Sequence, residues 1–88
     1  MTTTAELAEL ADLAALTVEA AIELGTDAAL RASAALQALG DLAQLAGRFT
    51  LSTLAHDHAK DVLGASAGRC GDIARLWRKY ARSTRGER

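Results

Sequence analysis

The sequence predicts an all-α protein, a helical hairpin of long amphipathic helices that assembles as a coiled coil or helical bundle. Three observations lead to this prediction. The 88 residues contain no proline, the residue that most strongly breaks helices. Alanine and leucine, both strong helix formers, dominate the chain. The few β-branched residues never alternate with polar ones as they do in a half-buried strand. We therefore expect a single helical domain over residues 1–82.

The first arm of the hairpin is expected over residues 4–39. Among the threonines that open the chain, Thr3 stands three residues before Glu6, which is the spacing of an N-terminal capping box, and further acids follow Thr4. Apolar residues then recur at helical spacing and cover a face wider than one neighbouring helix can bury. The sequence GTD at 25–27 offers a break within this arm, with Gly25 ending one helix and Thr26 or Asp27 capping the next.

The turn between the two arms is expected near residues 40–41, where Gly-Asp divides the chain into arms of similar length. The charge changes sign in the same region. Residues 1–45 carry seven acids and one base, whereas residues 46–88 carry nine bases and four acids. This polarity favours antiparallel helices, either within a hairpin or between chains.

The second arm is expected over residues 41–82, with an uncharged heptad seam that begins at Leu42. A seven-residue repeat of this length indicates left-handed supercoiling against a partner helix. One long helix is favoured, and the alternative is a break within residues 64–71 with Asp72 capping a last helix. A histidine on the seam would fix its register or make assembly sensitive to pH. The predicted self-association seam comprises Leu42, Leu45, Phe49, His56, Ala59, Leu63, Ile73, Trp77 and Tyr80.

The composition favours a homo-oligomer. Hydrophobic residues make up 50% of the chain, but aromatics only 3%. Alanine buries few methylene groups, each worth about 0.8 kcal/mol, so a monomeric core would be weak. Association with a second copy or with an apolar surface would compensate.

No pattern in the sequence predicts catalysis, a metal site or a cofactor. In HDHAKD, residues 56–61, the two histidines are about 200° apart on a helix and cannot share a metal. The Glu-x-x-His pairs of helical di-iron proteins are absent. We interpret this segment as a solvated helix face. Cys70 lies two or more turns from either histidine and is expected to be a buried, inert thiol.

The C-terminal segment is amphipathic, with aromatic residues on one face and cations on the other. Two interpretations remain open. The cations either pair with Glu6, Glu9 and Asp12 of the first arm, or contact an anionic partner outside the chain. Nucleic acid is the less favoured partner, because the aromatics are not interleaved with the bases as stacking platforms would be. Residues 83–88 are expected to form a frayed basic tail. The predicted anionic-partner contacts are Arg75, Arg78, Lys79 and Arg82.

The sequence favours a soluble, cytoplasmic protein. A charge interrupts every apolar stretch before it reaches the length of a transmembrane helix. The first residues lack the basic region of a signal peptide, and a lone cysteine is typical of a reducing compartment.

Residues 5–82 resemble the phasins, small proteins that coat polyhydroxyalkanoate storage granules in bacteria. The resemblance lies in the alanine- and leucine-rich amphipathic helices, in LQALGDLAQLAGRF at residues 36–49, and in the heptad arm that follows. It implies a helical, oligomerising, non-catalytic protein whose apolar helix faces lie on the granule polymer. The alternative is an oligomerisation or adaptor module that binds a protein partner or nucleic acid through its basic C-terminal helix. The predicted apolar-surface contacts are Leu7, Leu10, Leu13, Leu16, Ile22, Leu51 and Leu54.

Overall fold

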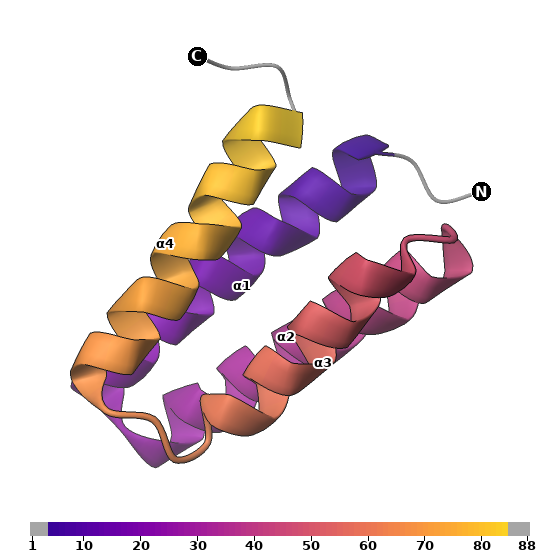
Figure 1. The fold of residues 1–88 in the computed structure, drawn as a ribbon. Helices are drawn as coiled ribbons and strands as arrows, with labels where there is room; N and C mark the ends of the chain where they lie inside the picture. Colours follow the sequence, from indigo (N-terminus) through magenta and orange to yellow (C-terminus); the bar gives the residue numbers. More distant parts are fainter. Residues whose placement is uncertain (1–3, 85–88) are drawn as a thin grey trace.

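The computed structural model describes residues 4–84, which form four helices and no strand (Figure 1). The all-α prediction is confirmed. The threonines that precede Thr4 and residues 85–88 of the expected tail lie outside the described residues, whereas Ser83 and Thr84 belong to α4 rather than to a frayed tail. The helices are α1 (Thr4–Leu24), α2 (Thr26–Leu45), α3 (Phe49–Asp61) and α4 (Ala67–Thr84).

The helices form two antiparallel pairs, α1 with α4 and α2 with α3, joined by packing between α1 and α2. In Figure 1, α4 lies in front of α1 and α3 in front of α2, and the pairs converge where the α1–α2 and α3–α4 connections lie. The radius of gyration is 12.0 Å, close to the value of about 12 Å expected for a compact chain of this length. The chain therefore buries a core without a second copy.

The core is built mainly from alanine. Most of the buried apolar side chains are alanines, and the largest fully buried ones are Trp77, Leu7, Leu36, Leu39, Ile73 and Val18. Small side chains let helix backbones approach closely but remove little apolar surface from water per residue. The few large side chains consequently carry much of the stability.

Two glycines with left-handed backbone end helices at the first two turns. Gly25 has a φ of 82° between α1 and α2, and Gly47 has a φ of 76° between α2 and α3. A residue with a Cβ is strained in this region, whereas glycine adopts it readily. The first of these turns is the GTD break that the sequence offers at residues 25–27. Neither Thr26 nor Asp27 caps α2, however, because Gly25 holds the N-cap position and no side chain caps it.

The expected turn at residues 40–41 is wrong. Gly40 and Asp41 lie inside α2, and the chain turns instead at residues 46–48. Gly40 is buried beneath α3, and a Cβ at this position would overlap the imidazole ring of His56. This glycine allows two helices to pack closely rather than ending one of them.

The single long helix favoured for the second arm is also wrong. Helix α3 ends at Asp61 and α4 begins at Ala67, so the break overlaps the start of the alternative at 64–71. The capping residue is Ser66 rather than Asp72, because the Ser66 hydroxyl accepts a hydrogen bond from the backbone N–H of Arg69 at 3.2 Å. Gly68 and Gly71 are accommodated within α4.

Replacing Ser66 with alanine is expected to destabilise the protein by about 1 kcal/mol, because α4 loses its side-chain N-cap. The measurement is the free energy of unfolding in urea. Ser83→Ala is the matched control, since Ser83 is exposed in the last turn of α4 and caps no helix start. Equal stabilities of the two variants would contradict the capping role.

Candidate functional site

The side of α1 that points away from the core carries a row of apolar residues. Leu13 is 50% exposed, Leu16 60% and Leu24 71%. These residues and the partly exposed Ala20 follow the i, i+3, i+7, i+11 spacing of one helix face. We call Leu13, Leu16, Ala20 and Leu24 the α1 face.

The α1 face reverses the usual distribution of large and small residues on a helix. The opposite side of α1 is fully buried, yet it consists mostly of alanines, among them Ala11 and Ala15. Alanine on that side permits close packing against α2 and α4, while the leucines remain in water. Single exposed leucines are common on protein surfaces, but a contiguous row of them marks a candidate contact surface.

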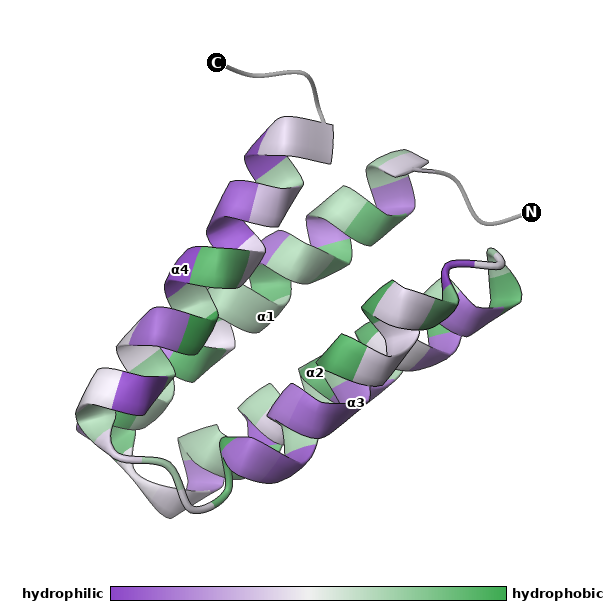
Figure 2. Ribbon diagram, in the orientation of Figure 1, coloured by the Kyte–Doolittle hydropathy of each residue, from purple (hydrophilic) through white to green (hydrophobic). Residues whose placement is uncertain are grey.

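The outward sides of α3 and α4 have the opposite character. Figure 2 shows largely hydrophilic colouring on the outward side of α4 and along the second half of α3, whereas the first half of α3 and α1 are paler and greener. Because α3 and α4 cover the front of the molecule and α1 lies behind α4, the α1 face and the charged side point in different directions. The exposed charged residues of α3 and α4 include Asp57, Lys60, Asp72, Arg75, Lys79 and Arg82.

The structure divides the predicted apolar-surface contacts. Leu13 and Leu16 belong to the α1 face, whereas Leu7 is only 1% exposed and packs in the core. Leu7 is therefore not available as a surface contact. Ile22 is 41% exposed but lies beside α4, where it lines a shallow hollow with Arg78.

The remaining predicted contacts, Leu10, Leu51 and Leu54, are partly buried against the core. Leu51 and Leu54 also line a second hollow, beside the exposed Phe49 at the start of α3. Leu24 is not among the predicted apolar-surface contacts. It lies four residues after Ala20 on the same helix face, so its spacing was the signal that could have identified it.

The predicted self-association seam does not run along one helix, because turns interrupt it before Phe49 and before Leu63. Ala59, Ile73 and Trp77 are buried in the chain's own core. Their contacts are made within one chain and are closed to a second copy in this fold.

The other seam residues lie nearer the surface. Leu45 is 80% exposed, Phe49 65% and Leu63 52%. The partly buried members are Leu42, His56 and Tyr80.

His58 is buried rather than solvated, so the sequence-based interpretation of HDHAKD is wrong at this residue. His58 is only 5% exposed. Its Nδ1 accepts a hydrogen bond from Nε1–H of Trp77 at 2.9 Å. The two rings meet edge to face with centroids 5.7 Å apart. A buried indole N–H needs a hydrogen-bond acceptor. The sequence could not identify His58 as that acceptor, because the turn at 62–66 that brings α4 beside α3 was not predicted.

Burial lowers the pKa of His58 below its ordinary value, because an imidazolium loses hydration inside the protein. The positive charge of Arg69 lowers this pKa further, while Asp61 and Asp57 oppose the shift. The folded protein therefore favours a neutral imidazole at this position.

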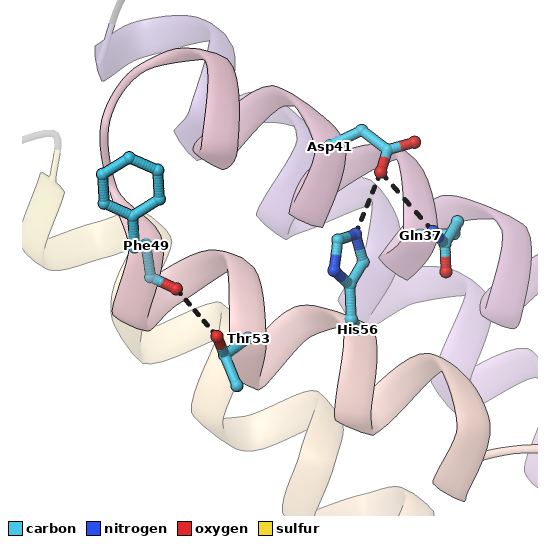
Figure 3. Close-up of polar contacts among 5 residues, drawn as sticks. All are labelled: Gln37, Asp41, Phe49, Thr53 and His56. Atoms are coloured by element: carbon cyan, nitrogen blue, oxygen red, sulfur yellow. Dashed lines mark hydrogen bonds and ion pairs between the residues drawn. The ribbon is translucent and has the colours of Figure 1, made fainter.

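The other histidine, His56, forms a polar contact on the outside of the α2–α3 pair (Figure 3). Its Nε2 lies 3.0 Å from Oδ1 of Asp41, which also accepts a hydrogen bond from Nε2 of Gln37 at 3.4 Å. On the same outer side, Thr53 donates its hydroxyl proton to the backbone carbonyl of Phe49 at 3.0 Å. His56 thus adds a polar link between α3 and α2.

The predicted cationic contacts fall into two groups, those with an acidic partner and those without one among the described residues. Arg78 forms an ion pair with Glu19 of α1, an acid that the sequence interpretation had not assigned to it. Arg75 lies 3.4 Å from Asp72 on its own helix. Among residues 4–84, the structure shows no ion pair for Lys79 or Arg82, and both are exposed. Arg78 therefore belongs to the α1–α4 interface rather than to an outer surface.

Within the described range, no three His, Cys, Asp or Glu residues lie close enough together to hold a metal ion. Cys70 is buried, as the sequence predicts. None of the four helices has the length and hydropathy needed to cross a membrane. Comparison with protein-family models, curated proteins and solved structures found no match to this chain.

Proposed function

We propose that this protein is a non-catalytic helical amphiphile that binds an apolar surface through the α1 face, as phasins do on polyhydroxyalkanoate granules. The observation that supports this proposal is the row of exposed leucines on α1, opposite an alanine-rich packed side. The charged sides of α3 and α4 would then face water. Such a protein would work in the cytoplasm, at the surface of a granule.

The driving force is the removal of the α1 face from water. Fully burying a leucine contributes about 1.5–3 kcal/mol, and the leucines of the α1 face keep half or more of their surface exposed. Each one therefore offers about 1 kcal/mol on adsorption. The three leucines together offer about 3 kcal/mol per molecule, without any unfolding of α1.

Self-association on the surface is part of the proposal. The seam residues still available to a second copy are Leu45, Phe49 and Leu63, all more than half exposed. Contacts between neighbouring copies through these residues would make the coat continuous.

The alternative function, binding of an anionic partner, is supported by exposed cations on one side of α4. Arg75, Lys79 and Arg82 follow the i, i+4, i+7 spacing, although Arg75 already has Asp72 as a neighbour. Few charges would be neutralised, so contact with nucleic acid would be weak and would decline steeply with salt. Adsorption through leucines should persist as salt rises.

The double substitution Leu13→Gln and Leu16→Gln is expected to weaken adsorption to hydrophobic polymer beads by about 30-fold, because it removes about 2 kcal/mol of buried apolar contact. The assay is the fraction of purified protein that sediments with beads at several salt concentrations. Far-UV circular dichroism verifies that the helices remain.

The matched control is the double substitution Leu30→Gln and Leu76→Gln, which changes two leucines that are 54% and 40% exposed and lie outside both the α1 face and the self-association residues. We expect this variant to adsorb like the original protein. Equal losses in the two double variants would refute a defined face. If the unsubstituted protein stays in the supernatant at every salt concentration, the proposed function is wrong.

A further inference from the structure

Helices α3 and α4 follow each other in the chain but pack far less closely than the other neighbouring helices. α1 packs along α4 and α2, and α2 packs along α3, whereas α3 and α4 show no comparable backbone packing. Within residues 4–84, the polar side-chain links between α3 and α4 are the His58–Trp77 hydrogen bond and the Arg69–Asp61 ion pair at 3.1 Å.

These two links differ in their surroundings. The side chains of Arg69 and Asp61 are each 49% exposed, and ion pairs in water contribute little to stability. The His58–Trp77 pair is enclosed, and Tyr80 meets the indole edge to face with ring centroids 5.9 Å apart. The enclosed pair is therefore the main polar contact between α3 and α4, and it lies within the apolar cluster that both helices share.

The hydrogen bond between His58 and Trp77 requires a neutral imidazole. The indole Nε1–H can only donate, so Nδ1 of His58 must present its lone pair. The proton of the neutral ring then resides on Nε2. Protonation of Nδ1 would place two N–H groups against each other and a positive charge in a buried position.

We propose that the His58–Trp77 pair is a pH-sensitive latch, and that protonation of His58 separates α3 from α4. The pairs α1–α4 and α2–α3 are each held by their own packing, so both persist when the latch opens. The packing between α1 and α2 that joins the pairs also persists, so the molecule then exposes Trp77 and the sides of α3 and α4 that face each other. The latch would operate whether or not the α1 face binds an apolar surface.

The charged groups around His58 set the direction of the response. On α3 itself, Asp57 and Asp61 favour the imidazolium, whereas Arg69 of α4 and burial disfavour it more strongly. On α2, the acid against α3 is Asp41, which is engaged by His56. The pKa of His58 is thus lower in the folded protein than in an open state.

The direction of this pKa difference determines the pH range in which the latch opens. The latched state binds fewer protons than the open state, so its advantage is complete above the ordinary histidine pKa of about 6.5. The advantage declines as the pH falls through the lowered pKa of the folded protein. Acid therefore opens the latch, and a return to neutral pH closes it.

The single tryptophan reports directly on the latch. We expect the Trp77 fluorescence of the original protein to shift to longer wavelength between about pH 7.5 and about pH 5, with a midpoint below about 6.5. Far-UV circular dichroism should remain constant over the same range, because both helix pairs persist. A simultaneous loss of helix content would show global unfolding and overturn the proposal.

Two variants locate the titrating group. His58→Asn places a non-titrating carbonyl acceptor near the position of Nδ1, so its fluorescence should stay constant across the range. His56→Gln removes the other histidine and should leave the transition unchanged. The proposal is overturned if His58→Asn keeps the transition, or if His56→Gln abolishes it.

A measurement on the unsubstituted protein keeps the test decisive if His58→Asn does not fold. Imidazole ring protons can be titrated by nuclear magnetic resonance, with the His56 signals identified by their absence in His56→Gln. We expect the His58 midpoint to lie below that of a free histidine and to coincide with the fluorescence midpoint. A His58 midpoint at or above about 6.5, or midpoints that differ, would refute the latch.

Discussion

Trp77→Ala is expected to leave the protein largely unfolded at neutral pH. Trp77 is fully buried and is the largest side chain in a core composed mostly of alanine. Truncating a buried tryptophan typically costs about 3–5 kcal/mol, and Nδ1 of His58 would also lose its donor, at a cost of about 1–3 kcal/mol. A small domain is stable by only about 5–15 kcal/mol, and we expect a core composed mostly of alanine to lie near the lower end of this range. The combined loss is then comparable to the whole margin.

The measurement is urea denaturation followed by far-UV circular dichroism, since the variant lacks the fluorescent residue. Leu76→Ala is the control, because Leu76 precedes Trp77 on α4 but is 40% exposed. We expect the control to lose about 1 kcal/mol. A Trp77→Ala variant as stable as Leu76→Ala would mean that the core does not depend on the indole.

Gly40→Ala is expected to destabilise the protein by about 1–2 kcal/mol, although alanine is the better helix former. In an open helix position this change would stabilise by about 1 kcal/mol. Here the new methyl group would overlap the imidazole of His56, and overpacking of this kind costs about 1–3 kcal/mol. The overlapping atoms include Nε2, the atom that contacts Asp41, so we expect a shift of the ring to weaken that contact.

A double-mutant cycle with His56→Ala isolates this effect. In the His56→Ala background the space opposite Gly40 is open, so Gly40→Ala should become stabilising by about 1 kcal/mol. The coupling energy between the two sites should therefore be about 2–3 kcal/mol. If Gly40→Ala has the same effect in both backgrounds, α3 does not approach α2 closely at this glycine.

Acid sensitivity and adsorption test different parts of the molecule. The latch depends on His58 and Trp77 inside the fold, whereas adsorption is proposed to depend on the leucines outside α1. Loss of one property by substitution should leave the other intact. An opened latch would nevertheless add Trp77 and the facing sides of α3 and α4 to the apolar surface that the protein can offer.

The local properties of the chain were largely predictable from its residues. The absence of proline, the abundance of alanine and leucine, and the lack of strand patterns predict helices throughout, because helix propensity is a property of each residue and its near neighbours. The same holds for the break at Gly25 and for the burial of Cys70. The excess of apolar residues on α1 beyond what its neighbours bury was also evident from spacing alone.

The positions of the second and third turns were not predictable in this way. Gly40 and Gly47 look equivalent in sequence, and each is followed by a charged residue. One supports close approach of α3 and the other adopts a left-handed φ of 76°. The two glycines differ in whether another helix packs against them, and this depends on the tertiary structure. The heptad pattern that begins at Leu42 runs through both turns in the sequence. Apolar spacing alone does not indicate where a helix ends.

The sequence by itself determined that this chain forms amphipathic helices, because propensity and apolar spacing act over a few residues. Only the tertiary structure decided which side chains meet. It buried Ile73 and Trp77 within one chain, assigned Arg78 to Glu19, and joined His58 to Trp77 across nineteen residues. Long-range pairs of this kind depend on the direction in which each turn sends the next helix, and a few backbone angles at Gly25, Gly47 and residues 62–66 set those directions.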